Sequence, residues 1–155
     1  MENCSIVNKP AIHLVGLSYC GPYSTFPDEV IALQTQFSSR KHELSEAKKP
    51  SVLICPQFAN EVLATYCVCL EVKHLLEEVP DKMVQFTIPA HQYAMTLVGE
   101  NRVGEGYEQL MTWMNQQQLR KNEHALSIEI YHTDSSMLEE GQVELLIPFL
   151  DKTIS

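Results

Sequence analysis

The sequence predicts an α+β fold in which a strand–helix–strand–strand module occurs twice, with antiparallel sheets around a central ligand cleft. The chain has 155 residues, of which 45% are apolar and 20% charged, a balance typical of a globular domain with a substantial core. The same order of apolar patterns runs twice along the chain, on either side of a charged, proline-containing segment at residues 75–81. We therefore expect a single domain over residues 1–155, with half-modules at about 5–75 and 82–151.

The first module opens with a strand over residues 10–19, where apolar and β-branched residues follow a proline. A turn signal comes next, and then a helix is expected over residues 26–44. Within that helix Val30, Leu33 and Phe37 recur at i, i+3 and i+7, which gives one apolar stripe. The stripe indicates a helix that lies with one side on a sheet.

Two strands complete the first module. The short apolar run at residues 52–55 predicts one strand, and the longer run at residues 62–72 predicts the other. We expect residues 57–61 to form the connection between them.

The second module repeats this order. Residues 84–98 predict extended chain, with a bulge or bend at Pro89 and Ala90. A helix is expected over residues 103–119, and strands over residues 127–132 and 143–150, joined by a polar turn that ends at residues 139–141. The apolar stripe of this helix is formed by Val103, Tyr107, Leu110, Met111 and Met114.

Charge and cysteine content exclude several function classes. The chain carries 20 Asp and Glu against 11 Lys and Arg, a formal charge of −9 that repels phosphate backbones and anionic lipids. No apolar run reaches the length of about 18 residues that a membrane helix needs, and no signal peptide is visible. The five cysteines are odd in number and scattered, which favours reduced thiols in the cytoplasm. We expect neither direct nucleic-acid binding nor membrane binding, and no metal site or cofactor.

The most informative segment is the strand over residues 127–132. Side chains alternate between faces along a strand, so Ser127, Glu129 and Tyr131 share one face. Ile128 and Ile130 share the other face, which we expect to pack onto the second helix. If the face of Glu129 is the outer surface, its carboxylate is simply solvated. If that face lines the cleft between the modules, the carboxylate needs a partner or a proton.

No lysine or arginine in the neighbouring predicted strands can supply that partner, since Arg120 and Lys121 lie in the preceding loop. The missing charge could therefore come from a ligand. A cationic aromatic molecule would suit Glu129 by Coulomb attraction and nearby aromatic rings by stacking and cation–π contact. The candidate ligand-binding residues are Glu129, Tyr131, Tyr66, Tyr93 and Trp113, although each aromatic residue could equally be a core or packing residue.

Four features in this order resemble a known family. They are the Ile88-Pro89-Ala90-x-x-Tyr93 segment, the Tyr107-x-x-x-x-x-Trp113 helix, the Glu129-x-Tyr131 strand and a last strand containing Ile147-Pro148. Together they resemble the DNA-gyrase-inhibitor-like (GyrI-like) small-molecule-binding family, which also supplies the effector-binding domain of AraC-type and MerR-type bacterial regulators. The resemblance covers about residues 5–151.

This resemblance implies a cleft for bulky, often cationic aromatic compounds, with Glu129 meeting the positive charge of the ligand. The match of Tyr131 and Tyr66 to the family pattern is looser. No helix-turn-helix segment precedes residue 5, so we expect a stand-alone version of the domain that does not contact a promoter.

The leading hypothesis is a cytoplasmic binder of hydrophobic cations that acts in sequestration or in ligand-dependent regulation, with a possible protein partner. A hydrolase of electrophilic natural products is an alternative, with Glu129 as general base and Tyr131 or Tyr66 as proton donor. A third alternative is a protein inhibitor of a DNA topoisomerase.

Overall fold

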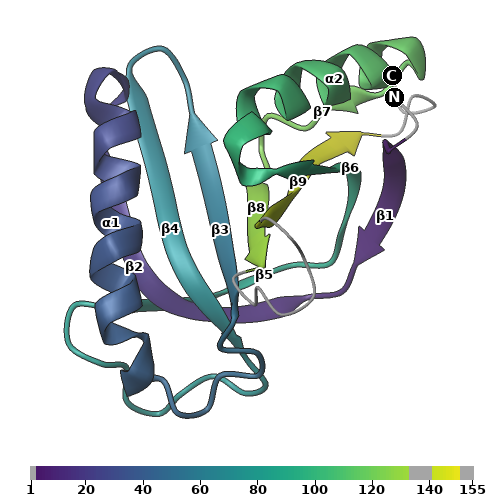
Figure 1. The fold of residues 1–155 in the computed structure, drawn as a ribbon. Coiled ribbons are helices and arrows are strands. Elements are labelled where there is room, and N and C mark those ends of the chain that lie inside the picture. The colour runs from purple at the N-terminus through teal and green to yellow at the C-terminus, as the bar shows by residue number, and fades with distance from the viewer. Residues whose placement is uncertain (1–2, 133–140, 151–155) are drawn as a thin grey trace.

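The computed structural model describes residues 3–132 and 141–150, and it consists of an antiparallel sheet with two α-helices (Figure 1). This arrangement confirms the predicted α+β class. The strands follow the order β1-β6-β9-β8-β3-β4-β2-β5 across the sheet, and β7 pairs with β9 at the side. The elements are β1 (Ser5–Lys9), β2 (Ile12–Pro22), α1 (Phe26–Arg40), β3 (Val52–Ala59), β4 (Leu63–Val72), β5 (Val84–Ile88), β6 (His91–Gly99), α2 (Val103–Gln116), β7 (Arg120–Lys121), β8 (Ser127–His132) and β9 (Gln142–Leu150).

The two runs of elements meet at the centre of the sheet, where β3 pairs with β8. On one side lie β4 and β2, and on the other lie β9 and β6, so that β2–α1–β3–β4 is repeated as β6–α2–β8–β9. Each of the two short strands β1 and β5 pairs with a strand of the other run, since β1 pairs with β6 and β5 pairs with β2. Each run therefore supplies the outermost strand of the other half of the sheet.

Both helices lie on the same face of the sheet. On that face Leu33 and Phe37 of α1 pack with residues of β2, β3 and β4, and Leu110 and Met114 of α2 pack with residues of β6 and β9. Figure 1 shows the two helices over separate halves of the sheet. Because Tyr131 of β8 borders both clusters, β8 lies beneath the boundary between the two helices.

The other face of the sheet forms a core of its own. Its buried residues come from strands that lie far apart in the sheet order, which requires the sheet to curve strongly. They are Leu14, Ile54, Cys67, Cys69, Ile88, Tyr93, Ile128, Ile130 and Leu146. The expectation that Ile128 and Ile130 pack onto the second helix was wrong. Alternation correctly gave them one common face, but the curved sheet buries that face without a helix.

Several element boundaries differ from the sequence-based expectation. Strand β1 was not predicted, and residues 57–59 belong to β3 instead of a connection. The expected extended run 84–98 divides into β5 and β6, which pair with different strands. Helix α2 stops at Gln116 because Gln118 adopts a left-handed backbone conformation with φ of 59°. The polar turn expected to end at residues 139–141 falls mainly outside the described residues.

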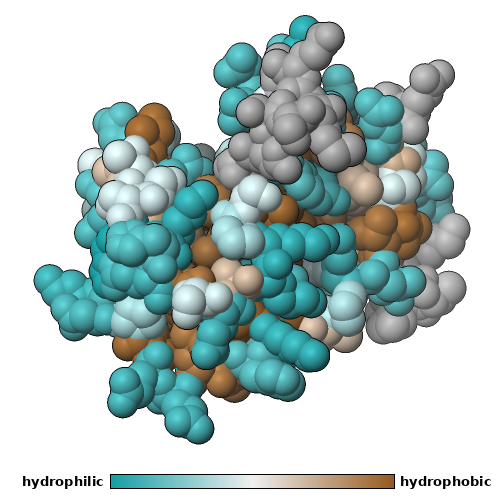
Figure 2. Space-filling view, turned by 60° about the horizontal axis from the view of Figure 1, so that its bottom comes forward, coloured by the Kyte–Doolittle hydropathy of each residue, from teal (hydrophilic) through white to brown (hydrophobic). Residues whose placement is uncertain are grey.

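The surface carries hydrophobic side chains in separate patches between hydrophilic ones on the face that Figure 2 shows. None of the helices within residues 3–132 and 141–150 is long and apolar enough to cross a membrane.

Candidate functional site

Glu129 of β8 is a buried carboxylate with three hydrogen-bond donors. Only 6% of the residue is exposed. Its Oε2 accepts hydrogen bonds from the Tyr107 hydroxyl at 2.7 Å and from the Gln57 amide at 3.0 Å. Its Oε1 accepts one from the Tyr131 hydroxyl at 2.7 Å. Neutral side chains therefore hold this carboxylate, and neither bulk water nor a charged side chain does so.

The position of Glu129 follows from the strand pairing. Its cross-strand neighbours are Cys55 of β3 and Leu145 of β9, both fully buried on the face that the helices cover. Gln57 pairs with Ser127, one step further along the same face. Since residues two apart on a strand share a face, the Gln57 amide is placed within reach of the Glu129 carboxylate.

Tyr107 comes from the first turns of α2 and links Gln57 to Glu129. Its oxygen accepts a hydrogen bond from the Gln57 amide at 2.6 Å, while its hydroxyl donates to Glu129. Burial, reinforced by the negative charge of Glu129, raises the pKa of Tyr107 far above its ordinary value. The same two causes raise the pKa of Tyr131. Both phenols therefore stay protonated and act as neutral donors.

Tyr66 and Cys55 extend this polar cluster towards α1. The Tyr66 hydroxyl accepts a hydrogen bond from the Gln34 amide at 3.0 Å, and burial raises the pKa of this tyrosine strongly. Burial also raises the pKa of the Cys55 thiol well above its ordinary range. A thiol that stays protonated is a poor nucleophile, so Cys55 is suited to packing and not to covalent catalysis.

No cationic side chain neutralises Glu129 in the part of the chain that the structure describes. The ion pairs there are Arg40–Glu43, Lys48–Glu71 and His132–Glu144. The described residues also contain no group of His, Cys, Asp and Glu side chains arranged to hold a metal ion. The site is thus a buried negative charge held by neutral groups only.

Two cavities flank the hydrogen-bond network of Glu129. One, of about 240 Å³, is lined by Gln57 and Tyr107, by aromatic and apolar side chains from both halves of the fold, and by the charged residues Lys121 and Glu123. The other, of about 350 Å³, is lined by Tyr131, Leu53, Glu100 and polar residues of α1. Gln57, Tyr107 and Tyr131, which donate hydrogen bonds to the carboxylate, therefore separate it from the two cavities.

Aromatic rings continue from the first cavity into the protein. Tyr23 and Phe26, which both line that cavity, are stacked with ring centroids 6.2 Å apart. Phe26 in turn meets Tyr66 edge to face at 5.8 Å. This row of rings offers a surface on which a flat aromatic group could stack.

The structure brings together three of the five predicted residues. Glu129 and Tyr131 are hydrogen-bonded, and Tyr66 lies in the same polar cluster, since the charge of Glu129 contributes to its raised pKa. Tyr93 lies on the opposite face of the sheet. Trp113 packs at the side of the α2 cluster and lines neither cavity beside Glu129.

Sequence reasoning missed Gln57 and Tyr107 as site residues. Gln57 was assigned to a connection because the apolar run that predicts the strand ends at Cys55. Tyr107 was assigned to the apolar stripe of its helix, although it is the one member of that stripe with a hydroxyl group. A buried tyrosine in such a stripe needs a hydrogen-bond partner, and this requirement was the signal available.

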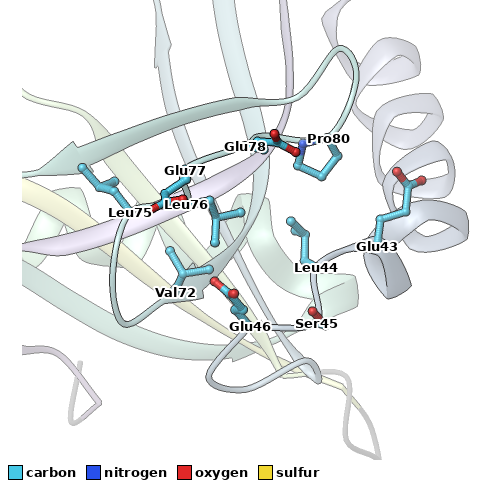
Figure 3. A pocket seen from close by; sticks show the side chains of 10 residues that line it. All are labelled: Glu43, Leu44, Ser45, Glu46, Val72, Leu75, Leu76, Glu77, Glu78 and Pro80. Carbon is cyan, nitrogen blue, oxygen red and sulfur yellow. The ribbon is translucent and has the colours of Figure 1, made fainter.

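A larger cavity, of about 520 Å³, lies in a different part of the fold (Figure 3). Leu44, Val72 and Leu76 form its apolar part, and the carboxylates of Glu43 and Glu46 lie at its border. Both glutamates are exposed to solvent. Exposed carboxylates are well hydrated and need no partner, so these glutamates differ from the buried carboxylate of Glu129.

Comparisons with known proteins agree with this fold. The chain is 36% identical over 92 residues to the transcriptional regulator BrlR of Pseudomonas aeruginosa, an alignment that covers 58% of this chain and 33% of the regulator. The structure of SAV2435 bound to tetraphenylphosphonium superposes with a TM-score of 0.70 and 13% identity, covering 95% of this chain and 93% of that one. The C-terminal domain of EcmrR superposes with a TM-score of 0.66 and 12% identity, covering 96% and 97%.

At such low identity the two structural matches establish the fold alone, and the chain spans about a third of the length of BrlR. The family match is broader. The model of the Cass2 family, described as integron-associated effector-binding proteins, matches residues 5–149. The chain therefore belongs to the Cass2 family of effector-binding proteins, and its fold is that of a GyrI-like effector-binding domain.

Proposed function

We propose that this effector-binding domain takes up bulky hydrophobic aromatic cations, with Glu129 as the counter-charge. The observation that carries the proposal is a carboxylate that is 6% exposed, accepts bonds from three neutral donors, and forms no ion pair with any described residue. A cation placed beside such a group gains more Coulomb energy than it would at a hydrated surface carboxylate.

The neighbouring donors allow this exchange at low cost. When a cation replaces Tyr107 or Gln57 at Oε2, these two side chains keep the 2.6 Å hydrogen bond that already joins them. A ligand therefore leaves fewer unpaired polar groups behind than it would if each donor depended on Glu129 alone.

The body of the ligand would occupy the cavity bordered by Tyr23, Phe26, Phe58, Tyr107 and Met111. Aromatic rings stack on such side chains and add cation–π contact of about 0.5–2 kcal/mol each. Methionine adapts its shape to irregular partners, which suits a site that accepts several compounds. The aromatic cation in the structure of SAV2435, a protein of the same fold, supports this ligand class.

Titration with tetraphenylphosphonium, followed by isothermal calorimetry, tests the proposal. Glu129→Gln should weaken binding about tenfold or more, because it removes a desolvated charge but keeps the size of the side chain. Glu144→Gln is the matched control, since it removes the same charge from the neighbouring strand, where Glu144 pairs with His132. This control should bind the cation as the wild type does.

Triphenylphosphine oxide, a neutral compound of related shape, should bind at least several-fold more weakly than the cation. Equal affinity of wild type and Glu129→Gln for tetraphenylphosphonium would refute the proposal. Repeated turnover of an electrophilic ester, abolished by Glu129→Gln, would instead favour the hydrolase alternative, whereas stoichiometric binding agrees with a role in sequestration or regulation.

A further inference from the structure

A separate cavity of about 270 Å³ lies beside the other face of the sheet, away from the helices. Its lining comes from the end of β5, the start of β6 and the segment before β8. The residues are Phe86, Thr87, Ile88, Pro89, His91, Tyr93, His124, Ala125 and Leu126. No carboxylate, lysine or arginine is among them, so the chemistry of this cavity differs from that of the Glu129 site.

Tyr93 is the unusual member of this lining. Only 2% of the residue is exposed, and its hydroxyl has no hydrogen-bond partner among the described groups. Burial alone raises its pKa, in contrast to Tyr107 and Tyr131, whose partners also contribute. The Tyr93 oxygen is not among the fully enclosed unpaired atoms of the described residues, so its hydroxyl reaches the cavity and is free to pair with a molecule inside it.

The surroundings of Tyr93 hold its ring in place. The His91 ring meets it edge to face, with centroids 5.5 Å apart, and His91 Nε2 lies 3.4 Å from the Asn122 amide. Phe86 and Leu126 add apolar surface. A mostly apolar cavity with a few fixed polar groups is the usual form of a small-molecule site, and here these groups are Tyr93, His91, His124 and Thr87.

We propose that this cavity binds a small neutral aromatic molecule with a hydroxyl or carbonyl oxygen, which pairs with the Tyr93 hydroxyl. The flat ring lies against Phe86 and Leu126, and the absence of a counter-charge excludes the bulky cations assigned to Glu129. The two sites lie on opposite faces of the sheet and approach each other at Ala125, which lines both cavities.

The test uses 1-naphthol, a neutral two-ring phenol, in a titration followed by its fluorescence and by backbone amide NMR shifts. Binding should shift amides in residues 86–93 and 122–126. Tyr93→Phe, which removes only the hydroxyl, should weaken binding about three- to tenfold. Tyr19→Phe is the matched control, because it removes a phenolic hydroxyl from the other face of the sheet, outside both proposed sites, and it should leave 1-naphthol affinity unchanged.

The melting temperature of Tyr93→Phe serves as the folding control and should not fall, because the hydroxyl that it loses has no partner in the protein. An unchanged 1-naphthol affinity in Tyr93→Phe would overturn the proposal. It would also be overturned if 1-naphthol failed to bind the wild type, or if tetraphenylphosphonium displaced it and Glu129→Gln abolished it. Loss of cation binding alone in Glu129→Gln concerns only the proposed function and leaves this second site intact.

Discussion

At the scale of single residues, the protein keeps a negative charge in its interior by surrounding it with neutral donors. Glu129 receives hydrogen bonds from Tyr107, Tyr131 and Gln57, each from a different element or strand position. Hydrogen bonds to a charged group contribute about 1.5–3 kcal/mol each, so these donors offset part of the cost of burial. They also compete with any cation for the same oxygen atoms.

This competition gives a prediction for Tyr107→Phe. The variant should lose about 1–2 kcal/mol of unfolding free energy, because Glu129 loses a donor and Gln57 loses an acceptor. It should bind tetraphenylphosphonium a few-fold more tightly, since one competitor for Oε2 is gone. Urea denaturation and calorimetric titration measure the two effects.

Tyr19→Phe is the control for this substitution, because its hydroxyl makes only an exposed contact of 3.3 Å with Thr25. It should change neither quantity. Weaker cation binding in Tyr107→Phe would show that the hydroxyl contacts the ligand and does not compete with it.

At the scale of elements, the close approach of β2 to β4 depends on a glycine. A Cβ atom at Gly16 would collide with the backbone of Val68 and Cys69 in β4. Gly104, near the start of α2, has open space around its Cβ position and a backbone conformation that alanine adopts. The two glycines therefore differ in what they do for the fold.

We predict opposite effects of alanine at these two positions. Gly16→Ala should lower the unfolding free energy by about 1–3 kcal/mol or more, as overpacking does, because only backbone movement can relieve the collision. Gly104→Ala should raise it by about 0.5 kcal/mol, because alanine restricts the unfolded chain and favours the helix. Thermal and urea unfolding of both variants, compared with wild type, check the signs, and a neutral Gly16→Ala would contradict the strand packing described here.

At the scale of the whole molecule, four buried tyrosines couple folding to pH. The pKa values of Tyr66, Tyr93, Tyr107 and Tyr131 are all raised in the folded protein, chiefly by burial. A raised pKa means that the folded state keeps the proton while the unfolded chain loses it near pH 10. The stability that these groups contribute is therefore complete below about pH 10 and falls as the pH rises further.

Above that pH each such tyrosine should reduce the unfolding free energy by about 1.4 kcal/mol per pH unit. Urea denaturation of wild type between pH 9 and 11 should show this decline, and Tyr107→Phe should show a slope shallower by the contribution of one tyrosine. Tyrosinate absorbance should rise together with the loss of circular dichroism. Equal slopes in the two proteins would mean that Tyr107 ionises without unfolding.

The fold class and most elements were predictable from local pattern. Strand β8 has the predicted bounds, and the stripe of Val30, Leu33 and Phe37 does face the sheet. The edge strand β1 was missed because a short, half-exposed strand carries little apolar pattern. Gln57 was missed because the apolar run that predicts this strand ends at Cys55, although β3 continues through Gln57 in register with β8.

The sequence by itself determined that Glu129 and Tyr131 share a face of their strand. Alternation along a strand sets this relation within a few residues, whatever the rest of the chain does. Only the tertiary structure decided that the helices cover this face, that Gln57 and Tyr107 meet there, and that Tyr93 lies on the other side. Which face of a strand the helices cover depends on which arrangement of apolar side chains gives the whole sheet the lowest free energy. That arrangement is set by contacts between residues far apart in the chain.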